Sequence, residues 1–184
     1  LLIQNNKTVK NQAKSSLNLY GLETYVSKNP YLEKASVFLT IHGKLKIVVR
    51  QRTPVVRIVD KDNSYYVDKQ GVKFPLSEHF SARVILVSGA EKEHEMNELM
   101  PLIRIILEDN FLQKEIVSIE KFDDGEVQFA VRSGEYKIDF GNLTEIDTKF
   151  KKLKVFYNNT FSDKTIQNYK IINVKYHNQV VCTK

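Results

Sequence analysis

The chain has 184 residues, of which 42% are hydrophobic and 27% charged, and this balance excludes an intrinsically disordered protein. That length suits one large domain or two small ones, each with a modest core. The formal net charge is +6, and residues 1–60 hold ten Lys and Arg against three Asp and Glu, whereas residues 61–184 hold eighteen against nineteen. The basic part indicates an ordinary solvated surface or, as the less favoured alternative, a surface for nucleic acid or anionic lipid.

The N-terminal residues indicate a piece of a longer protein. Residues 1–4 read as the end of an apolar element, and residues 5–16 are polar without an apolar period. The sequence contains no signal peptide and no apolar run of about 18 residues. We therefore expect any membrane anchor to lie outside this chain.

The next forty residues predict a helix packed on a β-hairpin. Asn18 is placed to cap a helix over residues 19–28, whose apolar positions share one face. Residues 35–41 and 45–51 then alternate as two strands do, with a turn at Gly43 between them.

The remainder of the chain predicts a β-rich region with two helices. Strands are predicted over residues 55–59, 65–68, 84–88, 115–119, 127–131 and 136–140. Helical spacing covers residues 96–107, where Pro101 implies a kink or a late start. A second helix over residues 144–157 has a capping box at Thr144 and Asp147. The fold class that we predict is α+β, with a mostly antiparallel sheet and two flanking helices in the second part.

Lysines occur at four positions of that second helix. Two interpretations fit them: a nucleic-acid-binding stripe, or the solvated side of an amphipathic helix. We favour the solvated side, because Arg and exposed aromatic residues do not accompany these lysines. The positions are Lys149, Lys151, Lys152 and Lys154.

The sequence offers little for catalysis or for a cofactor. The four histidines are scattered, with no Cys or His at metal-ligand spacing, and no nucleotide-binding or nucleophile motif is present. Residues 60–64 lack the Gly and the terminal Glu of a calcium loop, so they predict a plain hairpin turn. Cys182 has no partner for an intrachain disulfide and reads as a buried strand residue. We predict a protein that is not an enzyme and has no cofactor and no metal site.

The C-terminal residues predict a last pair of strands. Residues 169–176 read as a strand, His177 and Asn178 as a tight connection, and residues 179–183 as a returning strand. As the last element of the sequence, the returning strand is expected at the edge of the sheet, with unpaired N–H and C=O groups. Such an edge is a template for strand addition by a partner.

Several motifs occur in a definite order along the chain. The N-terminal ones are Pro30-Tyr31-Leu32 followed by Ala35-Ser36-Val37, then Leu45-Lys46-Ile47, Gln51-Arg52-Thr53-Pro54 and Tyr66-Val67-Asp68 with Gly71. The C-terminal ones are Phe140-Gly141, Lys152-Leu153-Lys154-Val155-Phe156-Tyr157 and Asn173-Val174-Lys175-Tyr176. In this order the motifs resemble the FtsQ/DivIB family of bacterial cell division proteins. Two departures from the family pattern are Gln51 in place of an acidic residue and the absence of Trp after the last strand.

The resemblance implies a domain organisation and a location. Residues 1–58 would form a POTRA-like domain that lacks its N-terminal strand and part of its first helix, with residues 1–4 as the end of that helix. Residues 59–184 would form the β domain typical of the family. The family's members are single-pass proteins of the inner membrane, and this region would lie on the periplasmic side. The transmembrane helix would precede the present chain.

The resemblance also implies a function and a binding site. The protein would be a non-enzymatic scaffold of the division complex that recruits FtsB/DivIC-like and FtsL-like proteins by strand addition at its C-terminal edge. Other division proteins would meet the POTRA-like half. The residues that match the partner-binding positions are Tyr176, Asn178, Gln179, Val180, Val181, Cys182 and Thr183.

Two other functions remain open at this point. One is a POTRA-containing component of an outer-membrane assembly or secretion system, although tandem repeats and a barrel are not seen in this sequence. The other is a basic nucleic-acid-binding module, which would show salt-sensitive binding to random DNA. We favour the division scaffold, with no nucleic acid among its partners.

Overall fold

The computed structural model describes residues 3–4, 7–8, 13, 16–59, 64–161 and 165–184, and it divides the chain into two compact units. The first unit comprises Leu1–Thr53 and the second Pro54–Lys184. Residues 54–58, which the sequence analysis grouped with the N-terminal domain, belong to the sheet of the second unit.

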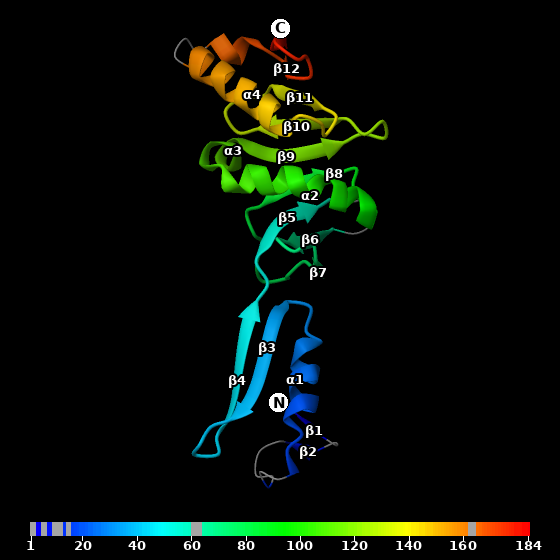
Figure 1. The fold of residues 1–184 in the computed structure, drawn as a ribbon, viewed down its shortest axis with the longest axis vertical. Helices are drawn as coiled ribbons and strands as arrows, with labels where there is room; N and C mark the ends of the chain where they lie inside the picture. The colour runs from blue at the N-terminus through cyan, green and yellow to red at the C-terminus, as the bar shows by residue number, and fades with distance from the viewer. Residues whose placement is uncertain (1–2, 5–6, 9–12, 14–15, 60–63, 162–164) are drawn as a thin grey trace. The chain divides into compact units, whose positions relative to one another are not determined.

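The first unit is a helix packed on a long β-hairpin (Figure 1). Helix α1 (Leu19–Ser27) begins where the Asn18 side chain accepts a hydrogen bond from Gly21 N at 2.8 Å, as predicted. Strands β3 (Leu32–Leu39) and β4 (Leu45–Gln51) pair antiparallel. Leu22 of α1 is buried together with Ala35 and Val37 of β3, so one face of the hairpin packs on the helix.

The N-terminal residues differ from the prediction. Ile3–Gln4 form strand β1, which pairs antiparallel with β2 (Lys7–Thr8), so the interpretation of these residues as the end of a helix is wrong. Leu1 and Leu2 lie outside the described residues. A two-residue strand is too short to show an alternating pattern in the sequence.

The second unit is built on one nine-stranded mixed sheet. Its strand order is β13-β12-β11-β10-β9-β8-β5-β6-β7, and most neighbours pair antiparallel, while β11–β12, β5–β8 and β8–β9 are parallel. The strands are β5 (Pro54–Ile58), β6 (Tyr65–Asp68), β7 (Lys73–Pro75), β8 (Ile85–Ser88), β9 (Ile116–Lys121), β10 (Val127–Val131), β11 (Lys137–Gly141), β12 (Ile171–Asn173) and β13 (Val181–Thr183).

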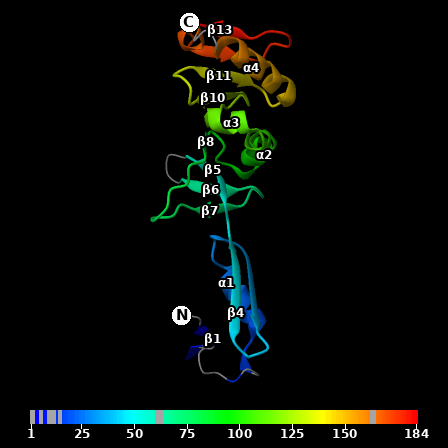
Figure 2. The same ribbon diagram turned by 90° about the vertical axis from the view of Figure 1, so that its left-hand side faces the viewer.

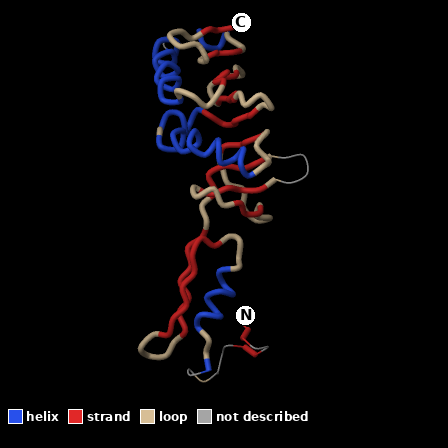
Figure 3. The backbone as a smooth tube through the Cα atoms, turned by 45° about the vertical axis from the view of Figure 1, so that its right-hand side comes forward, coloured by secondary structure: helices blue, strands red, loops and turns tan. Residues whose placement is uncertain are grey.

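Helices cover one face of this sheet, as Figures 2 and 3 show from two directions. They are α2 (Glu93–Glu108), α3 (Asn110–Glu115) and α4 (Ile146–Phe161), followed by the short 3-10 helix η2 (Thr165–Asn168). The alternation in strand β10 explains why one face is covered. Val127, Phe129 and Val131 are buried under the helices, whereas the residues between them are half-buried on the opposite face. The other face has no helix among the described residues, and we call it the helix-free face.

The architecture confirms the α+β class. The core of the second unit is one contiguous cluster, and the two methionines of α2 belong to it, at 2% and 5% exposure. Within the described residues, no helix is both long enough and apolar enough to cross a bilayer.

Both long helices begin at different residues from those the sequence indicated. Helix α2 begins at Glu93 and continues through Pro101, because Leu99 and Leu102 on either side are fully buried and hold the helix on the sheet. Helix α4 begins at Ile146, and the Thr144 hydroxyl donates to Asn142 Oδ1 at 2.6 Å. The predicted start at Thr144 is therefore wrong, because the residues before Ile146 form a hydrogen-bonded turn of their own.

Candidate functional site

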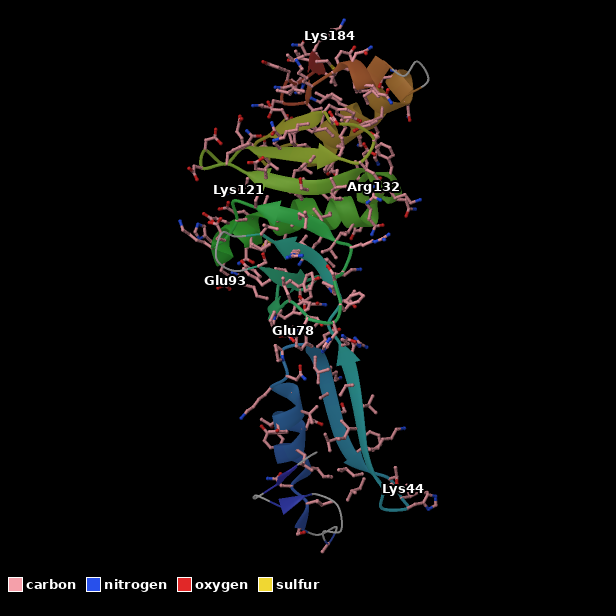
Figure 4. The ribbon with its side chains drawn as sticks, turned by 180° about the vertical axis from the view of Figure 1, so that it is seen from behind. Lys44, Glu78, Glu93, Lys121, Arg132 and Lys184 are labelled. Atoms are coloured by element: carbon pink, nitrogen blue, oxygen red, sulfur yellow. The ribbon has the colours of Figure 1, made fainter. Side chains whose placement is uncertain are left out.

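The candidate site is the outer edge of the sheet at β13, near Lys184 in Figure 4. Strand β13 pairs with β12 so that Ile172 lies opposite Cys182 and Asn173 opposite Val181. Among the described residues no strand pairs with the other side of β13. A strand with one neighbour leaves part of its backbone N–H and C=O groups without ladder partners, so this edge has room for one further strand.

Three of the predicted site residues lie in the connection between β12 and β13. Tyr176, Asn178 and Gln179 are all exposed, and Tyr176 is 51% exposed. An aromatic ring at this level of exposure retains a large apolar surface that a partner can bury. The connection therefore presents side chains for recognition next to the backbone of the open edge.

The remaining four predicted residues divide between the two faces of the strand. Val180 and Cys182 pack against the core on the helix-covered side. Val181 and Thr183 are exposed on the helix-free face. Burial raises the pKa of the Cys182 thiol, which makes it a weak nucleophile at neutral pH.

Lys152 of α4 holds the start of the connection in place. Its Nζ donates a hydrogen bond to Val174 O at 2.9 Å and another to Tyr176 O. Val174 itself is fully buried. Hydrogen bonds from a charged donor are stronger than those between neutral groups, so the backbone that leads into the open edge is fixed by α4.

Lys175 fixes the same connection on the helix-free face. Its Nζ lies 2.6 Å from Glu126 Oε2 and 3.0 Å from Asp139 Oδ2. The hydrogen bond to Glu126, with Asp139 adding to it, raises the pKa of Lys175 despite partial burial. Asp139 also accepts a hydrogen bond from Asn173 Nδ2 at 3.0 Å. These contacts join β11 and β12 to the residues that precede β10.

Three lysines of α4 make structural contacts that the sequence did not reveal: Lys149, Lys152 and Lys154. Lys149 is 4% exposed, donates to Asn142 O at 2.7 Å and Asn142 Oδ1 at 2.9 Å, and lies 5.0 Å from the Phe140 ring centroid. Burial lowers its pKa. The interpretation of this helix side as solvated is wrong for Lys149 and incomplete for Lys152 and Lys154. Their partners lie between 7 and 45 residues away in the sequence, so no local pattern marks them.

A buried cluster of hydroxyls surrounds Glu115 at the end of α3. Its Oε1 accepts hydrogen bonds from Ser133 Oγ and, at 3.1 Å, from the Tyr157 hydroxyl. The Tyr136 hydroxyl donates to the Tyr157 oxygen at 2.8 Å, and burial raises the pKa of both tyrosines. The cluster ties α3, the β10–β11 turn and α4 together, and its members line neither of the cavities described next.

Two adjoining cavities of about 480 and 280 Å³ lie between α4 and the corner where α2 meets α3. They share Glu108, Asp109 and Lys154 as lining residues. Burial alone would raise the pKa of Asp109, but the ion pair with Lys154 and the backbone N–H groups at the start of α3 lower it. In the described part of the chain, no three His, Cys, Asp or Glu side chains are close enough together to hold a metal ion.

Comparison with known proteins supplies the family. No curated protein matches the chain. The model of one protein family, described as FtsQ/DivIB, C-terminal related, matches residues 53–183, which include every strand of the nine-stranded sheet and the open edge. Because this match spans well over half of the sequence, the chain belongs to the FtsQ/DivIB family, whose members are non-enzymatic, membrane-anchored scaffolds of cell division.

Proposed function

We propose that this chain recruits small coiled-coil division proteins of the FtsB/DivIC and FtsL type by adding one of their strands to β13. The observation that carries the proposal is the open edge of β13, which has a single neighbour in the described sheet. The proposed contact residues are Tyr176, Asn178, Gln179, Val180, Val181, Cys182 and Thr183.

Affinity and selectivity would come from different groups at this site. Backbone hydrogen bonds along β13 give affinity for any extended segment, and side chains beside the strand select among segments. Tyr176 supports a selective role, because its half-exposed ring lies in the connection that adjoins the strand. Tyrosine is one of the residues that most often dominate binding energy at protein interfaces.

The contacts of Lys152 and Lys175 support binding to an edge that is already ordered. A partner that meets a fixed strand loses less free energy to ordering than one that must organise a loop first. Lys152 binds two carbonyls of the connection, and Lys175 is held by two carboxylates. Both lysines therefore contribute to recruitment as positioning residues.

The remaining parts of the proposal concern the domain layout and the location. We assign a POTRA-like domain to the first unit, where helix α1 packs on the β3–β4 hairpin, and the family's β domain to the second unit, which moves the boundary from residues 58/59 to residues 53/54. The protein would be held in the inner membrane by a helix outside this chain, with both domains in the periplasm. Anchoring two weak partners in one membrane raises their effective concentration, and other division proteins would meet the POTRA-like half.

The test is a binding titration of this chain against the periplasmic part of its own FtsB/DivIC-like partner. Proline would be placed at Val181 and, separately, at Cys182. Neighbouring residues of a strand direct their N–H groups to opposite sides, so one variant removes a donor from the open edge and the other removes a donor from the β12 ladder. The proline in the β12 ladder should lower the thermal unfolding midpoint. The proline on the open edge should leave that midpoint unchanged and abolish partner binding.

The control is a proline at the first position of helix α1 in the first unit, Leu19→Pro, because the first position of a helix tolerates proline. This variant should bind the partner as the parent does. Equal binding by the parent and by both β13 variants would place recruitment elsewhere on the chain, and no binding by the parent would reject the proposed partner class.

A further inference from the structure

The turn between β3 and β4 projects an isoleucine into solvent. Ile41 is 96% exposed, the highest value among the exposed large apolar residues of the described chain. The turn that carries it is ordered: Gly43 N donates to Thr40 O at 2.8 Å, and Thr40 N donates to Lys44 O at 2.9 Å. Gly43 has a φ of 70°, which favours glycine at this position. The fold thus holds one apolar side chain outward at a tight turn.

The surroundings of Ile41 are basic. No Asp or Glu occurs anywhere in residues 34–59, whereas Lys44 and Lys46 come shortly after Ile41, and Lys44 marks this turn in Figure 4. Phe38, 42% exposed, lies with its ring centroid 5.9 Å from Lys46 Nζ. Glu23, the acidic residue of helix α1, accepts a hydrogen bond from Val37 N at 2.9 Å.

The acidic residue at the start of β3 is also engaged. Glu33 forms an ion pair with Arg50 at 3.6 Å. Glu33 lies near the start of β3 and Arg50 near the end of β4, so this pair lies at the opposite end of the hairpin from the turn. Among the described residues neither Lys44 nor Lys46 forms an ion pair, so the turn has a net positive charge beside an exposed apolar side chain.

We propose that the β3–β4 turn is a contact site for an anionic lipid bilayer. Ile41 inserts among the lipid headgroups, Lys44 and Lys46 lie beside the phosphates, and Phe38 rests at the interface. A long lysine side chain can bury its methylene groups along apolar surface while its ammonium group remains with phosphate and water. Basic residues with apolar neighbours are the general chemistry of peripheral membrane contacts.

The size and shape of the turn favour a bilayer over an acidic protein. A specific protein interface takes about 20–30 residues on each side. The turn and the strand ends beside it offer four exposed side chains, Phe38, Ile41, Lys44 and Lys46, and a fluid headgroup layer can accommodate them without a matching pocket. Chains of this family are membrane-anchored, so a bilayer is within reach of the protein to which this turn belongs.

The turn is independent of the recruitment edge. It belongs to the first compact unit, whereas β13 belongs to the second. Failure of either proposal therefore leaves the other intact, and the two are tested with different binding partners.

The experiment is a sedimentation titration of the 184-residue chain with vesicles of phosphatidylcholine that contain 30% phosphatidylglycerol. The variants are Ile41→Ser and the double variant Lys44→Gln/Lys46→Gln. We expect Ile41→Ser to weaken binding about tenfold, because an apolar side chain no longer leaves water. Each lysine contributes about fivefold, so the double variant should weaken binding by roughly 25-fold.

Matched controls change the same chemistry elsewhere. Val155→Ser removes an exposed apolar side chain from α4, and Lys69→Gln/Lys114→Gln removes two exposed charges from the second unit. We expect these controls to bind within twofold of the parent, and the Ile41 variant to keep the parent's thermal unfolding midpoint.

Three results would overturn the proposal. The first is no binding by the parent, which would make an acidic protein the alternative partner. The second is equal binding to vesicles of phosphatidylcholine alone. The third is equal weakening by the two double variants, since that would indicate a general charge effect without a defined contact.

Discussion

Lys149 and Lys152 show how single side chains of α4 set the backbone around them. Their ammonium groups donate to Asn142 O, Val174 O and Tyr176 O, which follow the ends of strands β11 and β12. A carbonyl that is bound by a charged donor does not need a neighbouring strand. The two lysines therefore bind the backbone just beyond the ends of β11 and β12.

Replacement of Lys152 by Met tests this positioning role. Met keeps most of the side chain's length and removes the ammonium group, so the Val174 and Tyr176 carbonyls lose their donor. We expect the free energy of unfolding to fall by about 1–2 kcal/mol. Amide hydrogen exchange at residues 181–183 should become faster, because the segment that leads into β13 is released.

The control for this variant is Lys151→Met, the same change at an exposed neighbouring position. It should leave both the stability and the exchange rates close to those of the parent. If Lys152→Met behaves like Lys151→Met, then the connection is held by Lys175 and by its own packing, and Lys152 has no positioning role.

At the scale of elements, the sequence predicted several strands with the observed bounds. Residues 45–51, 65–68 and 127–131 were assigned correctly because turn residues flank each run and apolar residues alternate within it. Strand β7 and helix α3 were missed. Both are shorter than the window over which a period is visible, at three and six residues.

The two C-terminal strands were predicted too long, and the reason is tertiary. Alternation in the sequence extends over residues 169–176 and 179–183, but β12 and β13 have three residues each. Val174 O and Tyr176 O are bound by Lys152, and Lys175 N donates to Asn173 Oδ1 at 2.9 Å. Contacts with a helix about twenty residues earlier thus accompany the end of β12 at Asn173, and no local pattern contains that information.

Gly89, directly after β8, allows a prediction about one element boundary. It has a φ of 71°, and a Cβ there would lie 1.9 Å from Lys121 O of β9. Gly89→Ala should therefore cost about 3 kcal/mol of stability or prevent folding, because both the backbone strain and the overlap must be relieved. Chemical denaturation with fluorescence or circular dichroism measures this cost.

Gly125 supplies the matched comparison, since it has a φ of 82° with nothing within 4 Å of the added Cβ. Gly125→Ala should cost about 1 kcal/mol, from the backbone alone. Similar costs for the two alanine variants would mean that the close approach of β8 and β9 has no energetic weight.

At the scale of the whole molecule, the buried core is unevenly divided. The contiguous core cluster runs from Val56 to Val174 and lies entirely within the second unit. The first unit buries Leu22, Ala35 and Val37 among its described residues. A two-stranded hairpin with one helix is marginal by itself, whereas a nine-stranded sheet under three helices has enough apolar contact to fold alone.

We therefore expect residues 54–184, expressed alone, to unfold in one cooperative thermal transition. Residues 1–53 alone should show weak, non-cooperative melting. Circular dichroism and proton NMR of the two fragments distinguish these behaviours. A cooperative transition for residues 1–53 or an unfolded 54–184 fragment would contradict the assignment of the core.

The position of the candidate edge in the sheet could be predicted from the sequence, but the contacts that support this edge could not. The order of the strands indicated an edge at residues 179–183, and the structure has β13 at one end of the sheet. The supports of that edge come from Lys152, Glu126 and Asp139, which lie in other elements. The positive charge of the N-terminal residues could be read from the composition, whereas the exposure of Ile41 could be read only from the structure.

The two ends of the nine-stranded sheet are chemically unequal. At the end opposite to β13, the outermost strand β7 has three residues and includes Pro75, which has no N–H to offer. Copies stacked head to tail would pair β13 of one copy with β7 of the next, and β7 is a poor partner because it is short and contains proline. If a partner strand adds to β13 as proposed, this inequality of the two edges disfavours the head-to-tail stacking of copies that leads to fibres.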